Sequence, residues 1–231
     1  MSQTDTVHRI LDAAEVLFAE RGFTETSLRT ITSTAGVNLA AVNYHFGSKK
    51  ELIQAVFERF LTPFTEILNR ELTRRGAASE PLQLDDLLQS LYRVALAGLA
   101  SQGRDPKRFM RLLGLAYTQS QGHLRRFIVS RYGDSYRRFA GQLAAALPHV
   151  DPVTFYWRLY FMLGATVFSL SSFDAIEAIL REDFGAESSL EETLARLAPA
   201  AVAMLTAPMP GVGSGQVPGA SAPGGSTGDN R

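Results

Sequence analysis

The chain contains no cysteine, which excludes disulfide bonds, thiolate-bound zinc, iron–sulfur clusters and cysteine nucleophiles. It also has no excess of either charge, because 23 Lys and Arg residues balance 23 Asp and Glu residues. A formal net charge of zero excludes a global polybasic surface for nucleic acid or membranes. Any such surface therefore has to be local, and a reducing compartment such as the cytoplasm is the expected location.

Long hydrophobic runs are missing as well. The most membrane-like segment is the uncharged apolar run 159–173, which is shorter than the roughly 18 residues that a membrane-spanning helix needs. The N-terminus lacks the basic start and uninterrupted apolar stretch of a secretory signal. We expect a mature cytoplasmic protein with no membrane partner.

Catalytic and metal-binding motifs are also absent from the sequence. Its four histidines are scattered, and HExxH, GxSxG and GxxxxGK do not occur. These absences predict that the protein is not an enzyme and uses no metal or cofactor. An acyl-binding enzyme and a helical adaptor that binds other proteins remain as alternatives.

What the sequence does contain is helical periodicity throughout. Length and a hydrophobic content of 45% indicate one or two folded domains. Three short helices fit before residue 48: the first ends at Gly22, Ser27 and Gly36 bound the second, and Asn38 and Gly47 bound the third. No segment alternates like a strand, so we predict an all-α fold with an N-terminal helix-turn-helix.

A long helix is predicted to start at Ser48, which forms a capping box with Glu51, and to bend at Pro63. A loop follows at 76–81. Further helical patterns cover 83–100, 105–120, 122–147, 152–172, 174–182 and 190–206. The division into domains is therefore 1–48 for the helix-turn-helix, 49–206 for a helical regulatory and dimerisation domain, and 207–231 for a disordered Pro, Gly and Ser-rich tail.

A local basic bias falls on the helix-turn-helix. Residues 26–50 contain no acidic side chain, whereas Arg29, Lys49 and Lys50 are present. Lys49 and Lys50 lie in the first turn of a helix, where the macrodipole disfavours cations and a phosphate would compensate. Two solvated lysines are the alternative.

The third helix has an unusual predicted surface. With Val42 and Phe46 turned inward, small and polar residues remain outside, which suits the major groove of DNA. Ala41 can touch a thymine methyl group, and Asn43 can pair with adenine. Tyr44 and His45 can donate to phosphates, although either side chain has a structural alternative. The outer residues are Leu39, Ala40, Ala41, Asn43, Tyr44 and His45.

The segment RILDAAEVLFAERGFTETSLRTITSTAGVNLAAVNYHFGSKKELIQAVF resembles the DNA-binding head of the TetR family of bacterial regulators, over about residues 7–60. The resemblance implies double-stranded operator DNA as a partner. It implies that the DNA surface consists of Arg29, Asn38, Leu39, Ala40, Ala41, Asn43, Tyr44, His45, Lys49 and Lys50. One departure is Asn43, where many relatives carry Tyr.

The segments FMRLLGLAYTQSQGHLRRF and YWRLYFMLGATVFSLSSF resemble fatty-acid-responsive regulators of the same family. That resemblance implies a long-chain fatty acid or acyl-CoA as the effector and genes of lipid metabolism as targets. Gly114 leaves space for a ligand or, alternatively, permits close helix packing. Arg111, His123 and Arg158 are candidates for an acidic headgroup. The other candidate ligand residues are Phe109, Leu112, Leu113, Tyr117, Trp157 and Phe161.

Segment 153–170 is apolar nearly all round, so one core cannot bury it. A symmetric homodimer would supply a second partner, with Gly164 and Ala165 permitting close approach and 190–206 as the companion helix. The alternative is a central core helix in a monomer.

Overall fold

The structure is a computed structural model that describes residues 3–76, 83–100, 103–119 and 122–208. These residues form helices and no strand, which confirms the all-α prediction. The predicted tail at 207–231 and loop at 76–81 lie almost entirely outside the described residues. The helices are α1 Gln3–Glu25, α2 Leu28–Ala35, α3 Leu39–Phe46, α4 Lys49–Gly76, α5 Leu84–Ala100, α6 Pro106–Thr118, α7 Gly122–Ala145, α8 Pro152–Ser171, α9 Phe173–Phe184 and α10 Leu190–Thr206.

The helix ends follow the capping residues of the sequence. The Ser27 side chain accepts from the backbone N–H of Thr30, and Gly36 adopts the left-handed conformation after α2. The first helix was predicted to end at Gly22; instead it kinks there, where Gly22 has a φ of 82°, and continues to Glu25. At the start of α4, the backbone N–H of Glu51 donates to Ser48 Oγ over 3.3 Å.

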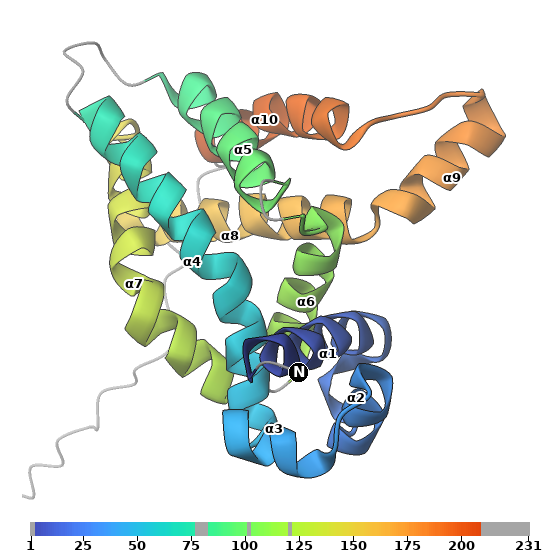
Figure 1. The fold of residues 1–231 in the computed structure, drawn as a ribbon. Helices are drawn as coiled ribbons and strands as arrows, with labels where there is room; N and C mark the ends of the chain where they lie inside the picture. The colour runs from blue at the N-terminus through green and yellow to red at the C-terminus, as the bar shows by residue number, and fades with distance from the viewer. Residues whose placement is uncertain (1–2, 77–82, 101–102, 120–121, 209–231) are drawn as a thin grey trace, which may run out of the picture.

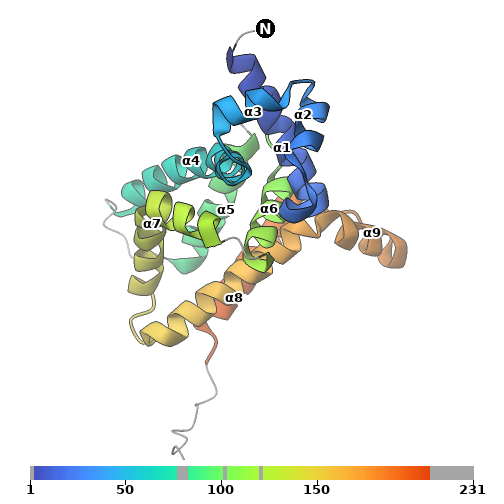
Figure 2. The same ribbon diagram turned by 90° about the horizontal axis from the view of Figure 1, so that it is seen from below.

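The head, α1 to α3, lies at one end of the molecule, and α4 leads from it into the remaining helices (Figure 1). Helix α6 packs against α1 of the head and against α8, while α10 packs against α5 and α8. Helix α9 projects away from the body. Seen from below, α8 lies across the molecule from α3 (Figure 2).

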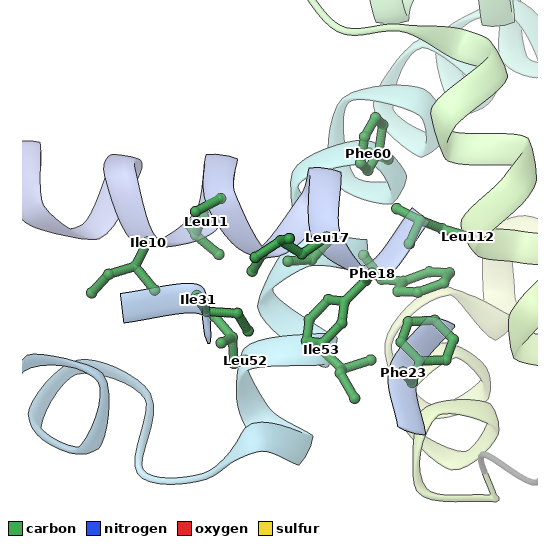
Figure 3. Packing of buried hydrophobic residues seen from close by; sticks show 14 of the residues in the cluster. Ile10, Leu11, Leu17, Phe18, Phe23, Ile31, Leu52, Ile53, Phe60 and Leu112 are labelled. Carbon is green, nitrogen blue, oxygen red and sulfur yellow. The ribbon is translucent and has the colours of Figure 1, made fainter. Parts of the chain in front are cut away.

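A single apolar cluster joins the head to the helices that follow it (Figure 3). Ile10 and Phe18 of α1 and Ile31 of α2 are fully buried in it, together with Leu52 of α4. The same cluster continues into Leu112 of α6. The orientation of the head is therefore coupled to α6 by shared packing.

Two further clusters lie among the helices beyond the head. One gathers α4, α5, α7, α8 and α10 around Leu72, Leu88, Leu143 and Leu205. The other joins Tyr92 of α5 to α8 and α10. Among the described helices, none alone is both long and apolar enough to cross a membrane; α8 and α9 meet that test only as a pair, bent by 68°.

The buried carboxylate of Glu15 lies between the head and α6. Its Oε2 lies 2.9 Å from Arg104 Nη1, and its Oε1 lies 3.1 Å from Arg108 Nη1. Arg59 of α4 approaches to 3.7 Å and also pairs with Asp12 at 2.6 Å. Burial lowers the pKa of Arg104, and the charge of Arg59 lowers it further. The Glu15 carboxylate is therefore the central negative charge in a crowded set of guanidinium groups.

We expect Glu15→Gln to lower the free energy of unfolding by about 3 kcal/mol, because it leaves partly buried arginines without their counter-charge. Urea denaturation followed by circular dichroism measures the loss. Glu20→Gln, an exposed position on the same helix, is the matched control and should change stability by less than about 0.5 kcal/mol. Equal stabilities of the two variants would show that the Glu15 charge does not join α1 to α6.

Candidate functional site

The outer face of α3 is open to solvent. Asn43 is exposed, and the Tyr44 ring is 74% exposed. His45 is half-buried with its ring 5.0 Å from that of Tyr44, and Gln3 Nε2 donates to the Tyr44 hydroxyl over 3.3 Å. Val42 is fully buried and Phe46 packs against the core as predicted. The helix therefore presents polar side chains outward from a fixed apolar base.

The residues predicted to contact DNA differ in their exposure and in whether they already have a partner within the protein. The Asn38 side chain accepts from the backbone N–H of Ala41 over 2.8 Å, so it caps α3. Leu39 and Ala40 are exposed at the first turn, whereas Ala41 packs partly against the core. Arg29 is exposed on α2. The first turn of α3 thus exposes apolar side chains, and the short alanine side chains allow another molecule to approach the helix closely.

The two lysines at the start of α4 differ. Lys50 is exposed, whereas Lys49 is half-buried and its Nζ donates to the Thr24 carbonyl over 3.4 Å. Partial burial lowers the pKa of Lys49, and Glu25 opposes that shift. The sequence gives no indication of this internal partner, because Thr24 lies on another helix.

An apolar groove of about 500 Å³ runs between α6 and α8. Gly114 forms part of its wall, and a Cβ there would lie 3.5 Å from Val167 Cγ1, an ordinary contact. The missing side chain of Gly114 thus both leaves space and permits close packing of α6 on α8. The lining consists of Ala19, Arg111, Gly114, Leu115, Tyr117, Thr118, Tyr160, Leu163, Gly164, Val167, Phe168 and Ser171.

Two tyrosines, Tyr117 and Tyr160, line the groove, and Tyr136 lies close enough to both to interact with them. Burial raises the pKa of Tyr117, and neighbouring Tyr160 raises it further while Arg125 opposes the shift. Burial, with Tyr160, Tyr156 and Tyr117 nearby, raises the pKa of Tyr136 to about 12. At neutral pH these phenols remain protonated and can donate hydrogen bonds.

Of the predicted ligand residues, the structure brings Arg111, Gly114 and Tyr117 together in this groove. Phe109 and Leu112 do not line it, because they point into the core and are 4% and 0% exposed. Leu113 is half-buried against the same core. The apolar stripe that the sequence displays on α6 therefore serves mainly to hold α6 against the head.

The predicted headgroup residues His123 and Arg158 are also outside the groove lining. Arg158 is buried and donates to the carbonyls of Leu205 and Ala207, over 2.6 and 2.5 Å, so it closes the end of α10. Burial lowers the pKa of His123, and the positive charges of Lys50 and Arg126 lower it further. His123 therefore lies on the side of the molecule that faces the head.

Trp157 and Phe161 likewise lie outside the groove. They are 60% and 54% exposed, on an apolar stripe along the outer face of α8. The opposite face of α8, with Phe155, Leu159 and Met162, is buried. The stripe, called the α8 face below, consists of Val153, Tyr156, Trp157, Tyr160, Phe161, Gly164 and Phe168.

Helix α6 contacts the head at both of its ends. Near its start are the bonds to Glu15 described above, and at its end Gln119 Oε1 accepts from the backbone N–H of Phe23 over 3.2 Å. Sequence reasoning missed both. The only local signal is that Glu15 sits within the apolar stripe of α1, between Ala14 and Phe18.

Two protein families match the chain over most of its length. Residues 10–56 match the family described as bacterial regulatory proteins, tetR family, and residues 89–204 match the tetracyclin repressor-like C-terminal domain. The chain belongs to the TetR family. The first match covers the helix-turn-helix, and the second begins within α5 and ends within α10.

Curated relatives of this TetR-family chain are similar over a short part of it. The HTH-type transcriptional repressor Rv3405c of Mycobacterium tuberculosis is 45% identical over 62 residues, which are 27% of this chain and 33% of that protein. The HTH-type transcriptional regulator TtgR of Pseudomonas putida is 41% identical over 54 residues, 23% of this chain and 26% of that protein. The chain thus spans about a third of the length of the first of these relatives.

Solved structures share the fold over nearly the whole chain. A tetR family transcription regulator from Shewanella sp. PV-4 superposes with a TM-score of 0.57 at 18% identity, covering 87% of this chain and 95% of that one. The fatty acid degradation regulator FadR from Bacillus halodurans gives 0.54 at 16% identity, covering 87% and 99%. At these identities the likeness concerns the fold.

Proposed function

We propose that this TetR-family protein is a DNA-binding transcriptional regulator, mainly a repressor, that a small apolar effector releases from its operator. The observation that carries the proposal is the exposed face of α3 beside the basic start of α4. Asn43 and Tyr44 are exposed there, and Lys50 stands at the N-terminus of the next helix. A face of this kind places side chains in the major groove and cations on the flanking phosphates.

Two substitutions on this face should affect DNA binding differently. Lys50→Ala removes a phosphate contact, so we expect weaker binding to all sequences and a decrease of about 1 in the slope of log affinity against log salt concentration. Asn43→Ala removes a base contact, so we expect a loss of about 1–3 kcal/mol that depends on particular base pairs. Fluorescence anisotropy with operator variants at several salt concentrations measures both effects.

Arg70→Ala is the matched control, because Arg70 is an exposed cation farther along α4. It should bind DNA like the wild type. Wild-type affinity and salt slope for Lys50→Ala would contradict the phosphate assignment. A uniform loss for Asn43→Ala across all sequences would place that side chain on the DNA backbone.

We further propose that the protein is a homodimer that places two heads on a pseudo-palindrome with half-sites roughly one helical turn apart. The α8 face supports this, because contiguous exposed aromatic side chains on a protein surface typically mark an interface. In a two-fold interface the same face meets itself, and α10 packs beside α8. The groove opens beside Tyr160 and Phe168 of this face, so a second copy would cover its outer edge.

Phe161→Asp should weaken dimerisation at least about a hundredfold, since two-fold symmetry places two charges in one apolar interface. Sedimentation equilibrium measures the dissociation constant. Val129→Asp, which changes another exposed apolar residue, on α7, should leave the dimer intact. Wild-type association of Phe161→Asp would remove the α8 face from the interface.

We propose a long-chain fatty acid or acyl-CoA as the effector and genes of lipid metabolism as targets. The support is the apolar groove, whose volume lies in the range of small-molecule pockets, and the resemblance of the α6 and α8 segments to fatty-acid-responsive regulators. Helix α6 lines the groove and also binds the head through Arg108 and Gln119. An effector that favours another position of α6 by about 1.4 kcal/mol shifts the balance between DNA-binding and released states tenfold.

Oleate or oleoyl-CoA should release the protein from its operator, whereas a short-chain acid should not. Gly114→Leu should raise the oleate concentration needed for release at least about tenfold, because its side chain fills the groove. Titration of the protein–operator complex measures the half-release concentration.

Gly141→Leu is the control, because Gly141 is a helical glycine with open space around it, outside the groove. It should respond to oleate like the wild type. If neither long-chain ligand releases the protein from DNA, the fatty-acid effector is wrong. If oleate releases Gly114→Leu and the wild type at the same concentration, the ligand binds away from α6.

A further inference from the structure

At the edge of the groove, two basic side chains of α6 bind one carboxylate. Lys107 Nζ lies 2.6 Å from Asp174 Oδ1, and Arg111 Nη2 lies 3.2 Å from Asp174 Oδ2. Arg111 Nε also donates to the carbonyl of Ser171 over 3.1 Å. Arg111 and Ser171 both line the groove. Each oxygen of the carboxylate thus has its own cation, at the place where an apolar groove meets solvent.

The helix that carries this carboxylate is weakly attached. No residue of α9 is buried, and α9 projects away from the body in Figure 1. Besides the ion pairs, Lys107 Nζ lies 5.1 Å from the centroid of the Phe173 ring. The side chains of Lys107, Arg111 and Asp174 are 30%, 43% and 53% exposed. Exposed pairs of this kind contribute little to stability, so another anion can replace Asp174 at small cost.

The Asp174 side chain is itself the anion that Lys107 and Arg111 bind in this structure. The hydrogen bond from Lys107 lowers its pKa, partial burial opposes the shift, and the charges of Lys107 and Arg111 lower it further. The group therefore remains a carboxylate at neutral pH. It presents to α6 the same chemical group that a fatty acid carries at the end of its chain.

We propose that Asp174 is an internal substitute for the acidic headgroup of the effector. This inference rests on the proposed function, in which the groove holds the apolar chain. An anionic amphiphile places its chain between α6 and α8, and its headgroup takes the place of Asp174 at Lys107 and Arg111. Binding of the ligand then breaks the ion pairs that join α9 to α6.

The inference makes Asp174 a competitor of the ligand, and this distinguishes it from a purely structural residue. Asp174→Asn removes the competing charge and leaves both cations in place. It should therefore bind oleate about two- to fivefold more tightly than the wild type, the range expected for exposed ion pairs. Oleyl alcohol, which has the same chain and no charge, should bind both proteins equally.

Equilibrium dialysis of the full chain with labelled oleate, oleyl alcohol and oleoyl-CoA measures these affinities without DNA. Asp183→Asn is the matched control, because it removes an exposed acid from the same helix. Arg111→Gln should weaken oleate severalfold and leave oleyl alcohol unchanged. If oleoyl-CoA places a phosphate at the site, its affinity follows that of oleate across the variants; if oleate alone responds, the site takes the free acid.

If the wild type binds oleate, and Asp174→Asn binds oleate and oleoyl-CoA with the same affinities as the wild type, the inference is overturned. The proposed effector then still stands. Weaker oleate binding by Asp174→Asn would also overturn it, because Asp174 would then support the site. If none of the three long-chain ligands binds the wild type, the fatty-acid effector itself is wrong and the inference is wrong with it.

Discussion

Helix α6 links the two halves of the molecule, because it packs against the head on one side and against α8 on the other. On one side it shares an apolar core with α1, α2 and α4, and Leu112 is fully buried in that core. On the other side it packs against α8 and forms one wall of the groove. Because packed interiors transmit displacement, α6 cannot move against α8 without changing its contacts with the head. The proposed effector site and the proposed DNA surface are therefore linked by one short helix.

Charge supports this arrangement in a chain with no net charge. The basic side chains on and just before α6 are divided between two acidic partners: Arg104 and Arg108 bind buried Glu15, and Lys107 and Arg111 bind exposed Asp174. Burial makes the first group strong and costly to break, whereas exposure makes the second group weak. The same helix thus has a firm attachment to the head and a replaceable attachment to α9. In the proposed mechanism, this asymmetry allows an anion to act at one side of α6 without unfolding the other.

Local rules accounted for most of the helices. Ser27, Asn38, Gly36 and Gly47 bound α2 and α3 as predicted, because capping depends on a few neighbouring residues. The inward position of Val42 followed from helical spacing for the same reason. The exposed polar face of α3 was equally predictable. The choice among apolar residues in the later helices was less predictable, since Phe109 and Trp157 look alike in sequence but one is buried and the other is 60% exposed.

Periodicity, caps and the motif of the head are local properties, so the helical class, the family and the exposed face of α3 could be predicted from the amino-acid sequence. The contacts between residues of different helices could not be predicted in this way. Glu15 and Arg108 are far apart in the chain, as are Arg158 and Leu205, and nothing near either residue specifies its partner. Likewise, the groove exists only where α6 and α8 come together, so Arg111 belongs to it and His123 does not. Such contacts depend on how helices pack, which one helix's own sequence does not encode.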